Sequence, residues 1–143
     1  MATVEQVKSK VQGFLQKHGS VTIDNEGDFA YEWGSSAVFI RVLDWGDGDV
    51  LVNVYSIVAA QVPITDELCA DLILERSMVV GSWSINRDPD NSKVGDVTFS
   101  IRLFGNDLDE SEIIKAIALT GEVADDQDDQ IVARFGGKRL SDL

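Results

Sequence analysis

The 143-residue chain contains few of the residues that carry most enzyme chemistry. It has one histidine, His18, and one cysteine, Cys69, so it cannot form an internal disulfide bond, which fits a reducing compartment. No nucleophile motif surrounds Cys69, and no glycine-rich loop joins a strand to a helix as a phosphate site requires. The longest apolar stretches, such as 54–60, are far below the roughly 20 residues needed to cross a bilayer. We therefore expect a cytoplasmic protein that is not an enzyme and needs no cofactor.

Basic residues are scarce as well. The chain has 12 Lys and Arg against 25 Asp and Glu, which gives a formal net charge of −13. Proteins that bind nucleic acids neutralise phosphates with Lys and Arg, and anionic membranes repel an acidic surface for the same reason. We expect neither nucleic acid nor membrane as a partner, and a weak preference for cationic or basic segments.

Two apolar periodicities predict the order of the elements. Apolar residues at three- and four-residue steps indicate helices at 3–18, 66–77 and 109–135. Alternating or β-branched runs indicate strands at 21–23, 29–33, 37–44, 50–59, 79–87 and 94–104. The order is α-β-β-β-β-α-β-β-α, with hairpins and no βαβ alternation. It predicts the α+β class, with a twisted antiparallel or mixed sheet and helices mainly on one face.

No repeat or linker divides the chain. We therefore expect a single domain over residues 1–137. Gly136 and Gly137 end the last helical pattern, and a short mobile tail is expected at 138–143.

Two acidic loops suggest an alternative, a small-ligand or divalent-cation-binding domain. The loop 44–49 carries three aspartates, and the loop 88–92 places acids at alternate positions as an EF-hand does. In the second loop, however, Lys93 stands at the glycine position and Phe99 at the bidentate glutamate position. Hairpin turns account for both loops better, so we assign no metal ligand.

The last helix is strongly acidic. Five of the eight residues 122–129 are carboxylates: Glu122, Asp125, Asp126, Asp128 and Asp129. A solvated helix face is the expected explanation, and a contact surface for a cation or a basic peptide is the alternative.

The hairpin of strands 37–44 and 50–58 has two unlike faces. One face is plainly core: Val38, Ile40, Val42, Val50, Val52 and Val54. The other mixes large apolar groups with polar ones: Phe39, Arg41, Leu43, Leu51, Asn53, Tyr55 and Ile57. In a continuous sheet, Thr98, Ser100 and Arg102 would share this second face.

Aromatic residues and arginine are enriched at the centres of interfaces. We therefore predict partner binding by five residues of the second face: Phe39, Arg41, Leu43, Asn53 and Tyr55. The alternative is that a helix or loop of the same chain covers them.

Three features suggest a family. They are the element order, the stretch 39–55, and the end of the last helix, Val-Ala-Arg-Phe-Gly-Gly at 132–137. In these the chain resembles the YbjN-like domain family, which is related in fold to type III secretion chaperones. The resemblance covers roughly residues 4–137 and implies a compact α+β fold, frequent homodimers and no catalytic residues.

Secretion chaperones hold an extended segment of a client protein on their surface. The resemblance therefore implies a non-enzymatic interaction module, chaperone-like or regulatory. Together with the half-apolar sheet face, it predicts a homodimer that binds a segment of a partner protein through that face.

Overall fold

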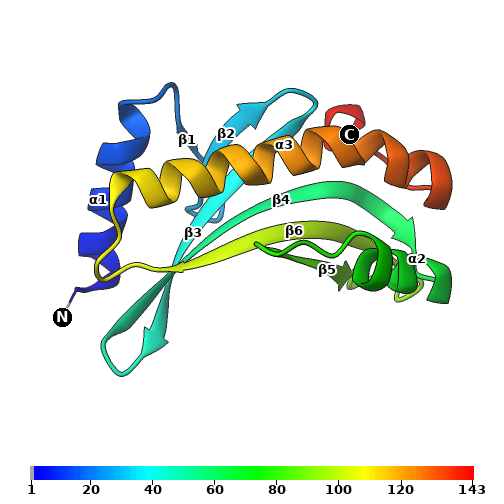
Figure 1. The fold of residues 1–143 in the computed structure, drawn as a ribbon, viewed down its shortest axis with the longest axis horizontal. Coiled ribbons are helices and arrows are strands. Elements are labelled where there is room, and N and C mark those ends of the chain that lie inside the picture. The colour runs from blue at the N-terminus through cyan, green and yellow to red at the C-terminus, as the bar shows by residue number, and fades with distance from the viewer. Residues whose placement is uncertain (1) are drawn as a thin grey trace.

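The computed structural model describes residues 2–143, which form one six-stranded antiparallel sheet with helices packed on it (Figure 1). The strands are β1 Thr22–Ile23, β2 Phe29–Trp33, β3 Ser36–Gly46, β4 Asp49–Pro63, β5 Ser82–Arg87 and β6 Val94–Phe104. The helices are α1 Val4–Gln16, α2 Asp66–Ala70, the π-helix η1 Asp71–Glu75, α3 Glu110–Phe135 and the 3₁₀ turn η2 Leu140–Asp142. The strands lie in the order β1-β2-β3-β4-β6-β5. The α+β class, the antiparallel sheet and the predicted order of the main elements are confirmed.

Local signals in the sequence fix the ends of the long helices. Thr3 and Gln6 form a capping box at the start of α1, and Asp109 and Glu112 form one at the start of α3. Gly136, at φ 90°, ends α3, and its N–H donates to the Val132 carbonyl.

The β3–β4 hairpin forms at the predicted turn. Asp47 and Gly48, the two residues between the strands, both have positive φ, at 53° and 81°. This is the geometry of a type I′ turn, whose twist matches that of the paired strands.

The core lies between the sheet and the helices. The side of the hairpin predicted as core is buried, with Val38, Ile40 and Val52 fully inaccessible. Val7, Val11 and Leu15 of α1 pack into the same core, as do apolar residues of α3 such as Ile113 and Ile131. Figure 1 shows α3 running across the sheet, with β4 arching beneath it.

The region 66–81 differs from the expected helix and strand. The α-helix has only five residues, and the chain then makes a π turn in which the Arg76 N–H donates to the Asp71 carbonyl. Strand β5 begins at Ser82, three residues later than predicted, after a bend at Gly81 with φ 86°. A Cβ at Gly81 would lie 2.4 Å from the Phe99 ring, so only glycine fits this bend.

The last residues make defined contacts. Lys138 exchanges two backbone hydrogen bonds with Ala60, of 2.7 and 2.9 Å. Arg139 pairs with Asp129 and Asp142, each at 2.9 Å. Residues 138–143 are thus tied to β4 and α3, and their mobility stays a prediction.

Among residues 2–143, none of the helices combines the length and the apolarity needed to cross a bilayer.

Candidate functional site

The sheet has one face that carries α1 and α3 and one that we call the bare face. The bare face consists of the residues of β3, β4 and β6 that alternate with the core. The register arranges them in three rows across these strands: Leu43–Leu51–Phe104, Arg41–Asn53–Arg102 and Phe39–Tyr55–Ser100. The predicted residues Phe39, Arg41, Leu43, Asn53 and Tyr55 therefore lie together on one face.

An internal ion-pair cluster occupies the middle of the bare face. Asp28, in the loop before β2, has a side chain that is only 4% exposed. It accepts hydrogen bonds from Arg41 Nε at 2.9 Å and from the Tyr55 hydroxyl at 2.7 Å. Glu26 also pairs with Arg41, and Phe39 stacks on Tyr55 with ring centroids 5.4 Å apart.

The pKa values reflect this cluster. The hydrogen bond to Asp28 raises the pKa of the Arg41 guanidinium above its usual value. Burial, and then the hydrogen bond to Asp28, raise the pKa of Tyr55. Arg41 is therefore a charged group whose partners come from its own chain, and the loop 24–28 covers part of the face.

Outside this cluster, parts of the bare face are open. Leu43 and Phe104 are 37% and 64% exposed on either side of the buried Leu51. Arg102 is exposed and makes no ion pair with any residue of 2–143. The Asn53 Oδ1 atom is buried and has no hydrogen-bond partner in the same part of the chain.

The sequence prediction missed Phe104. Its signal is that it breaks the alternation of β6, because the apolar Leu103 before it already faces the core side. An apolar residue out of phase with its strand belongs to the opposite face.

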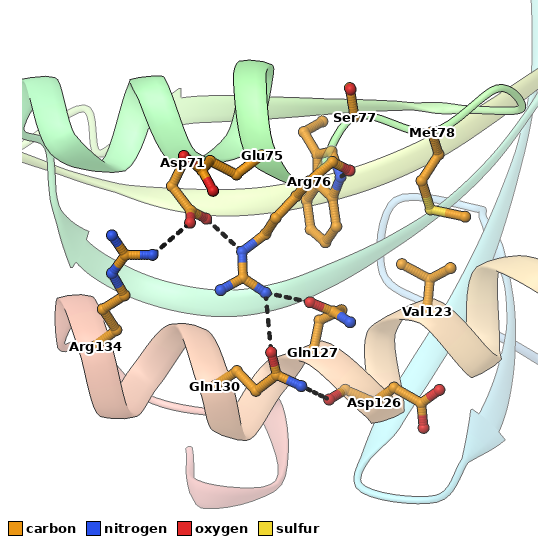
Figure 2. Close-up of a pocket in the computed structure, with 11 residues that line it drawn as sticks. Asp71, Glu75, Arg76, Ser77, Met78, Val123, Asp126, Gln127, Gln130 and Arg134 are labelled. Carbon is orange, nitrogen blue, oxygen red and sulfur yellow. Dashed lines mark hydrogen bonds and ion pairs between the residues drawn. The ribbon is translucent and has the colours of Figure 1, made fainter.

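A cleft of about 570 Å³ lies on the helix-covered side, between η1 and α3 (Figure 2). The buried carboxylate of Asp71, 3% exposed, holds its two walls together. It accepts from Arg76 of the segment after η1 and, at 2.7 Å, from Arg134 of α3. Arg76 also donates to Gln127 and Gln130 of α3, and its carbonyl accepts from the Trp83 indole at 2.8 Å.

The sequence prediction missed this cleft because its residues come from two distant segments, 71–83 and 123–134. The only local signal is Asp71 itself, which lies three residues after the buried Leu68 and beside the buried Leu72. A carboxylate on the apolar stripe of a helix needs a buried partner. The sequence does not say that the partner is Arg134.

The acidic loops are ordinary turns. Asp44 accepts from the Gly46 N–H at 2.9 Å, and Asp88 accepts from the Asp90 N–H at 2.8 Å. Within residues 2–143, no three side chains of the His, Cys, Asp or Glu type gather closely enough to hold a metal ion. His18 lies 3.8 Å from Glu110, at the start of α3.

Comparisons with known proteins agree with this architecture. The model of the family described as T3SS (YopN, CesT) and YbjN peptide-binding chaperone 1 matches residues 2–143. The crystal structure of YbjN from E. coli, a suggested transcription regulator, has a similar fold, with a TM-score of 0.60. The two sequences are 13% identical, and the alignment covers 91% of this chain and 96% of YbjN. No curated protein sequence matches the chain.

Proposed function

Because the chain belongs to the family of T3SS and YbjN peptide-binding chaperones, we propose that it binds an extended segment of a partner protein on its bare face. It acts there without catalysis, as a chaperone-like or regulatory module of the cytoplasm. The observation that carries this function is the exposed apolar row Leu43–Leu51–Phe104 on a sheet face that carries neither α1 nor α3.

Each row has a separate role in binding. Apolar side chains of the segment pack on Leu43 and Phe104, where burial removes exposed apolar surface from water. In the next row, Arg102 donates to a carboxylate or carbonyl of the segment. The Asn53 Oδ1 atom accepts from a donor that its own chain does not supply.

The residues of the ion-pair cluster and its aromatic stack have a supporting role. Phe39, Arg41 and Tyr55 are fixed by stacking and by Asp28. A rigid platform loses little entropy when the partner binds. We therefore assign recognition mainly to Leu43, Asn53, Arg102 and Phe104.

The test is affinity capture of partners from the native host, followed by titration of overlapping peptides from each captured protein. The double variant Leu43→Ser/Phe104→Ser should lose the captured partners and weaken the best peptide at least tenfold. Ile23→Ser removes an apolar residue of β1 whose exposed fraction, 60%, is close to the 64% of Phe104, and this variant should retain both the partners and the peptide. Peptide binding that is equal in the two variants would rule out the bare face.

We also propose that the protein is a homodimer formed through the exposed apolar residues of the segment 73–80, which we call the apolar patch: Ile73, Leu74, Val79 and Val80. All four side chains are at least half exposed, and Val79 is fully so. A chain of net charge −13 repels its own copy, so the contact needs apolar surface whose burial offsets that repulsion.

Light scattering tests the dimer. The wild type should have a mass of about 31 kDa, twice the 15.6 kDa chain, and Leu74→Lys/Val79→Lys should have the mass of one chain. Trp45→Lys/Ile23→Lys places the same two charges on exposed apolar residues outside the patch and should leave the dimer intact. A wild-type mass of one chain would contradict the proposal.

A further inference from the structure

We propose that the cleft between η1 and α3 binds a lysine or arginine side chain of a basic, partly apolar peptide segment. The cleft lies on the helix-covered side of the sheet (Figure 2). Binding there is therefore independent of the bare face and would be a second contact with a partner protein.

The two arginines of the cleft are already bound. Asp71 accepts from both Arg76 and Arg134, and Figure 2 shows its carboxylate between the two guanidinium groups. Arg76 is further held by the side-chain oxygens of Gln127 and Gln130. Arg76 is 14% exposed and is not an open anion site, whereas Arg134 is 58% exposed and has one guanidinium nitrogen bonded to Asp71. A phosphate or carboxylate would therefore meet one guanidinium group, against the open carboxylates of the same cleft.

The carboxylates of the cleft, in contrast, are open. Glu75 and Asp126 line it from opposite walls, are exposed and make no ion pair within residues 2–143. The exposed Glu122 of α3 also makes no ion pair within residues 2–143. Asp129, further along α3, is neutralised by Arg139. Counting Asp71, three carboxylates oppose two guanidinium groups in the lining, and the field of the whole chain adds to this negative potential.

The same cleft has an apolar part that the protein does not fill. Met78 is 40% exposed, and Trp83 and Val123 line the space beside it. Lysine and arginine bury their apolar stems while the charged end remains near carboxylates, so this wall suits their stems. Methionine adapts to different side chains, and the Trp83 ring attracts a cation.

Together, these features select the occupant. The apolar wall disfavours a bare inorganic cation, and the open carboxylates disfavour an acidic or neutral apolar segment. A basic residue flanked by apolar residues matches both walls. Charge complementarity with the −13 chain would speed its encounter with the protein.

Calorimetric titration at 50 mM salt tests the site. The probe is a blocked octapeptide with three lysines and two leucines; one comparison peptide has serine for leucine, and another has glutamate for lysine. The variant Glu75→Gln/Asp126→Asn should weaken the lysine–leucine peptide about three- to thirtyfold, as expected for two ion pairs at a partly exposed site.

Matched variants separate this site from other effects. Asp49→Asn/Asp107→Asn also removes two exposed, unpaired carboxylates, so both double variants change the net charge from −13 to −11. This control should change the affinity less than twofold, and the serine peptide should bind less tightly than the leucine peptide. Leu43→Ser/Phe104→Ser, the bare-face variant, should bind the probe like the wild type.

Four results would overturn the proposal. Equal weakening by the two carboxylate variants would mean that only the overall charge attracts the peptide. Equal binding of the serine and leucine peptides would show that the apolar wall makes no contact. Loss of binding in the bare-face variant alone would place the basic segment on the bare face. No binding to the wild type would mean that the protein does not bind a basic segment of this kind. Apart from loss of binding in the bare-face variant, these results do not bear on partner binding at the bare face, which the captured peptides test.

Discussion

At the scale of single residues, Asp28 organises the bare face. The sequence pattern suggested that Arg41 is a cation available to a partner. In the structure, Asp28 lies in a loop 13 residues before Arg41 and neutralises it, while it also accepts from Tyr55. Since Asp28 is buried, the removal of its partner leaves a carboxylate with poor solvation.

The first prediction concerns this ion pair. Arg41→Ala should lower the free energy of unfolding by about 1–3 kcal/mol, because Arg41 is partly solvated and Asp28 is not. Arg102→Ala, in the same row but without an ion pair, should change it by less than about 0.5 kcal/mol. Urea denaturation measures both values, and equal losses would show that the Asp28 cluster contributes no stability.

The second prediction concerns pH. Hydrogen bonds from the backbone N–H and the hydroxyl of Ser35 lower the pKa of Asp125, and those from Glu112 and Ser111 lower the pKa of Asp109. A lowered pKa in the folded state means that the unfolded chain binds more protons. The stability that these carboxylates provide is therefore present above their unfolded pKa of about 3.9 and is lost as the pH falls through the folded value.

Asp125→Asn removes one of these groups. The variant should be less stable than the wild type at pH 7, and its urea midpoint should fall less steeply between pH 4 and pH 2. Asp90→Asn, a carboxylate exposed in the loop before β6, is the control and should follow the wild type. Parallel curves for all three proteins would contradict a role of the Ser35 contact.

At the scale of elements, two helical glycines have opposite surroundings. A Cβ at Gly121 of α3 would lie 2.4 Å from the Trp33 ring, whereas one at Gly13 of α1 would meet no atom within 4 Å. Gly121 is therefore the residue that lets α3 approach β2. Gly13 has no such role and only weakens its helix.

The third prediction follows from this difference. Gly13→Ala should raise the free energy of unfolding by up to about 1 kcal/mol, because alanine favours the helix. Gly121→Ala should lower it by about 1–3 kcal/mol, because the added methyl group overpacks the Trp33 contact. Thermal unfolding of the two variants provides the comparison, and a stabilising Gly121→Ala would contradict the close packing of α3 on β2.

The π-helix has a physical reason that the sequence did not reveal. In an α-helix, residues three and four apart share a face, so Asp71 and Arg76 would point apart. The hydrogen bond from the Arg76 N–H to the Asp71 carbonyl widens the turn and brings residues five apart over one another. Arg76 can then bind the Asp71 carboxylate and line the cleft.

At the scale of the whole molecule, charge and apolar surface act against each other. Two chains of net charge −13 repel each other, while the patch Ile73, Leu74, Val79 and Val80 favours contact. Salt screens the repulsion between exposed charges, since the Debye length falls from about 30 Å at 0.01 M to about 3 Å at 1 M.

The fourth prediction is therefore that salt strengthens the homodimer. At micromolar concentrations, the mass from light scattering should rise towards about 31 kDa, twice 15.6 kDa, between 20 mM and 500 mM NaCl. Leu74→Lys/Val79→Lys should keep the mass of one chain at every salt concentration. A mass that falls as salt is added would mean that ion pairs hold the two copies together.

Much of the fold could be predicted because its signals are local. The apolar periods of α1 and β6, the capping pair Asp109 and Glu112, and the two faces of the β3–β4 hairpin need no knowledge of distant residues. A helix does form at 66–75, but the prediction missed its π-helical second half and the later start of β5, where a buried ion pair and the bend at Gly81 outweigh helix and strand propensity. The partner-binding role of Phe39, Arg41, Leu43, Asn53 and Tyr55 stays a prediction.

The sequence by itself determined the order of elements, the side of each strand that faces the core, and the acidity of the surface, because each depends on neighbours along the chain. Only the tertiary structure decided which groups remain open. The strand register joins Leu43, Leu51 and Phe104 into one row, Asp28 neutralises Arg41, and Asp71 holds Arg134 from 63 residues away. Such contacts depend on packing between distant segments, and packing leaves Arg102, Glu75 and Asp126 without ion-pair partners among residues 2–143.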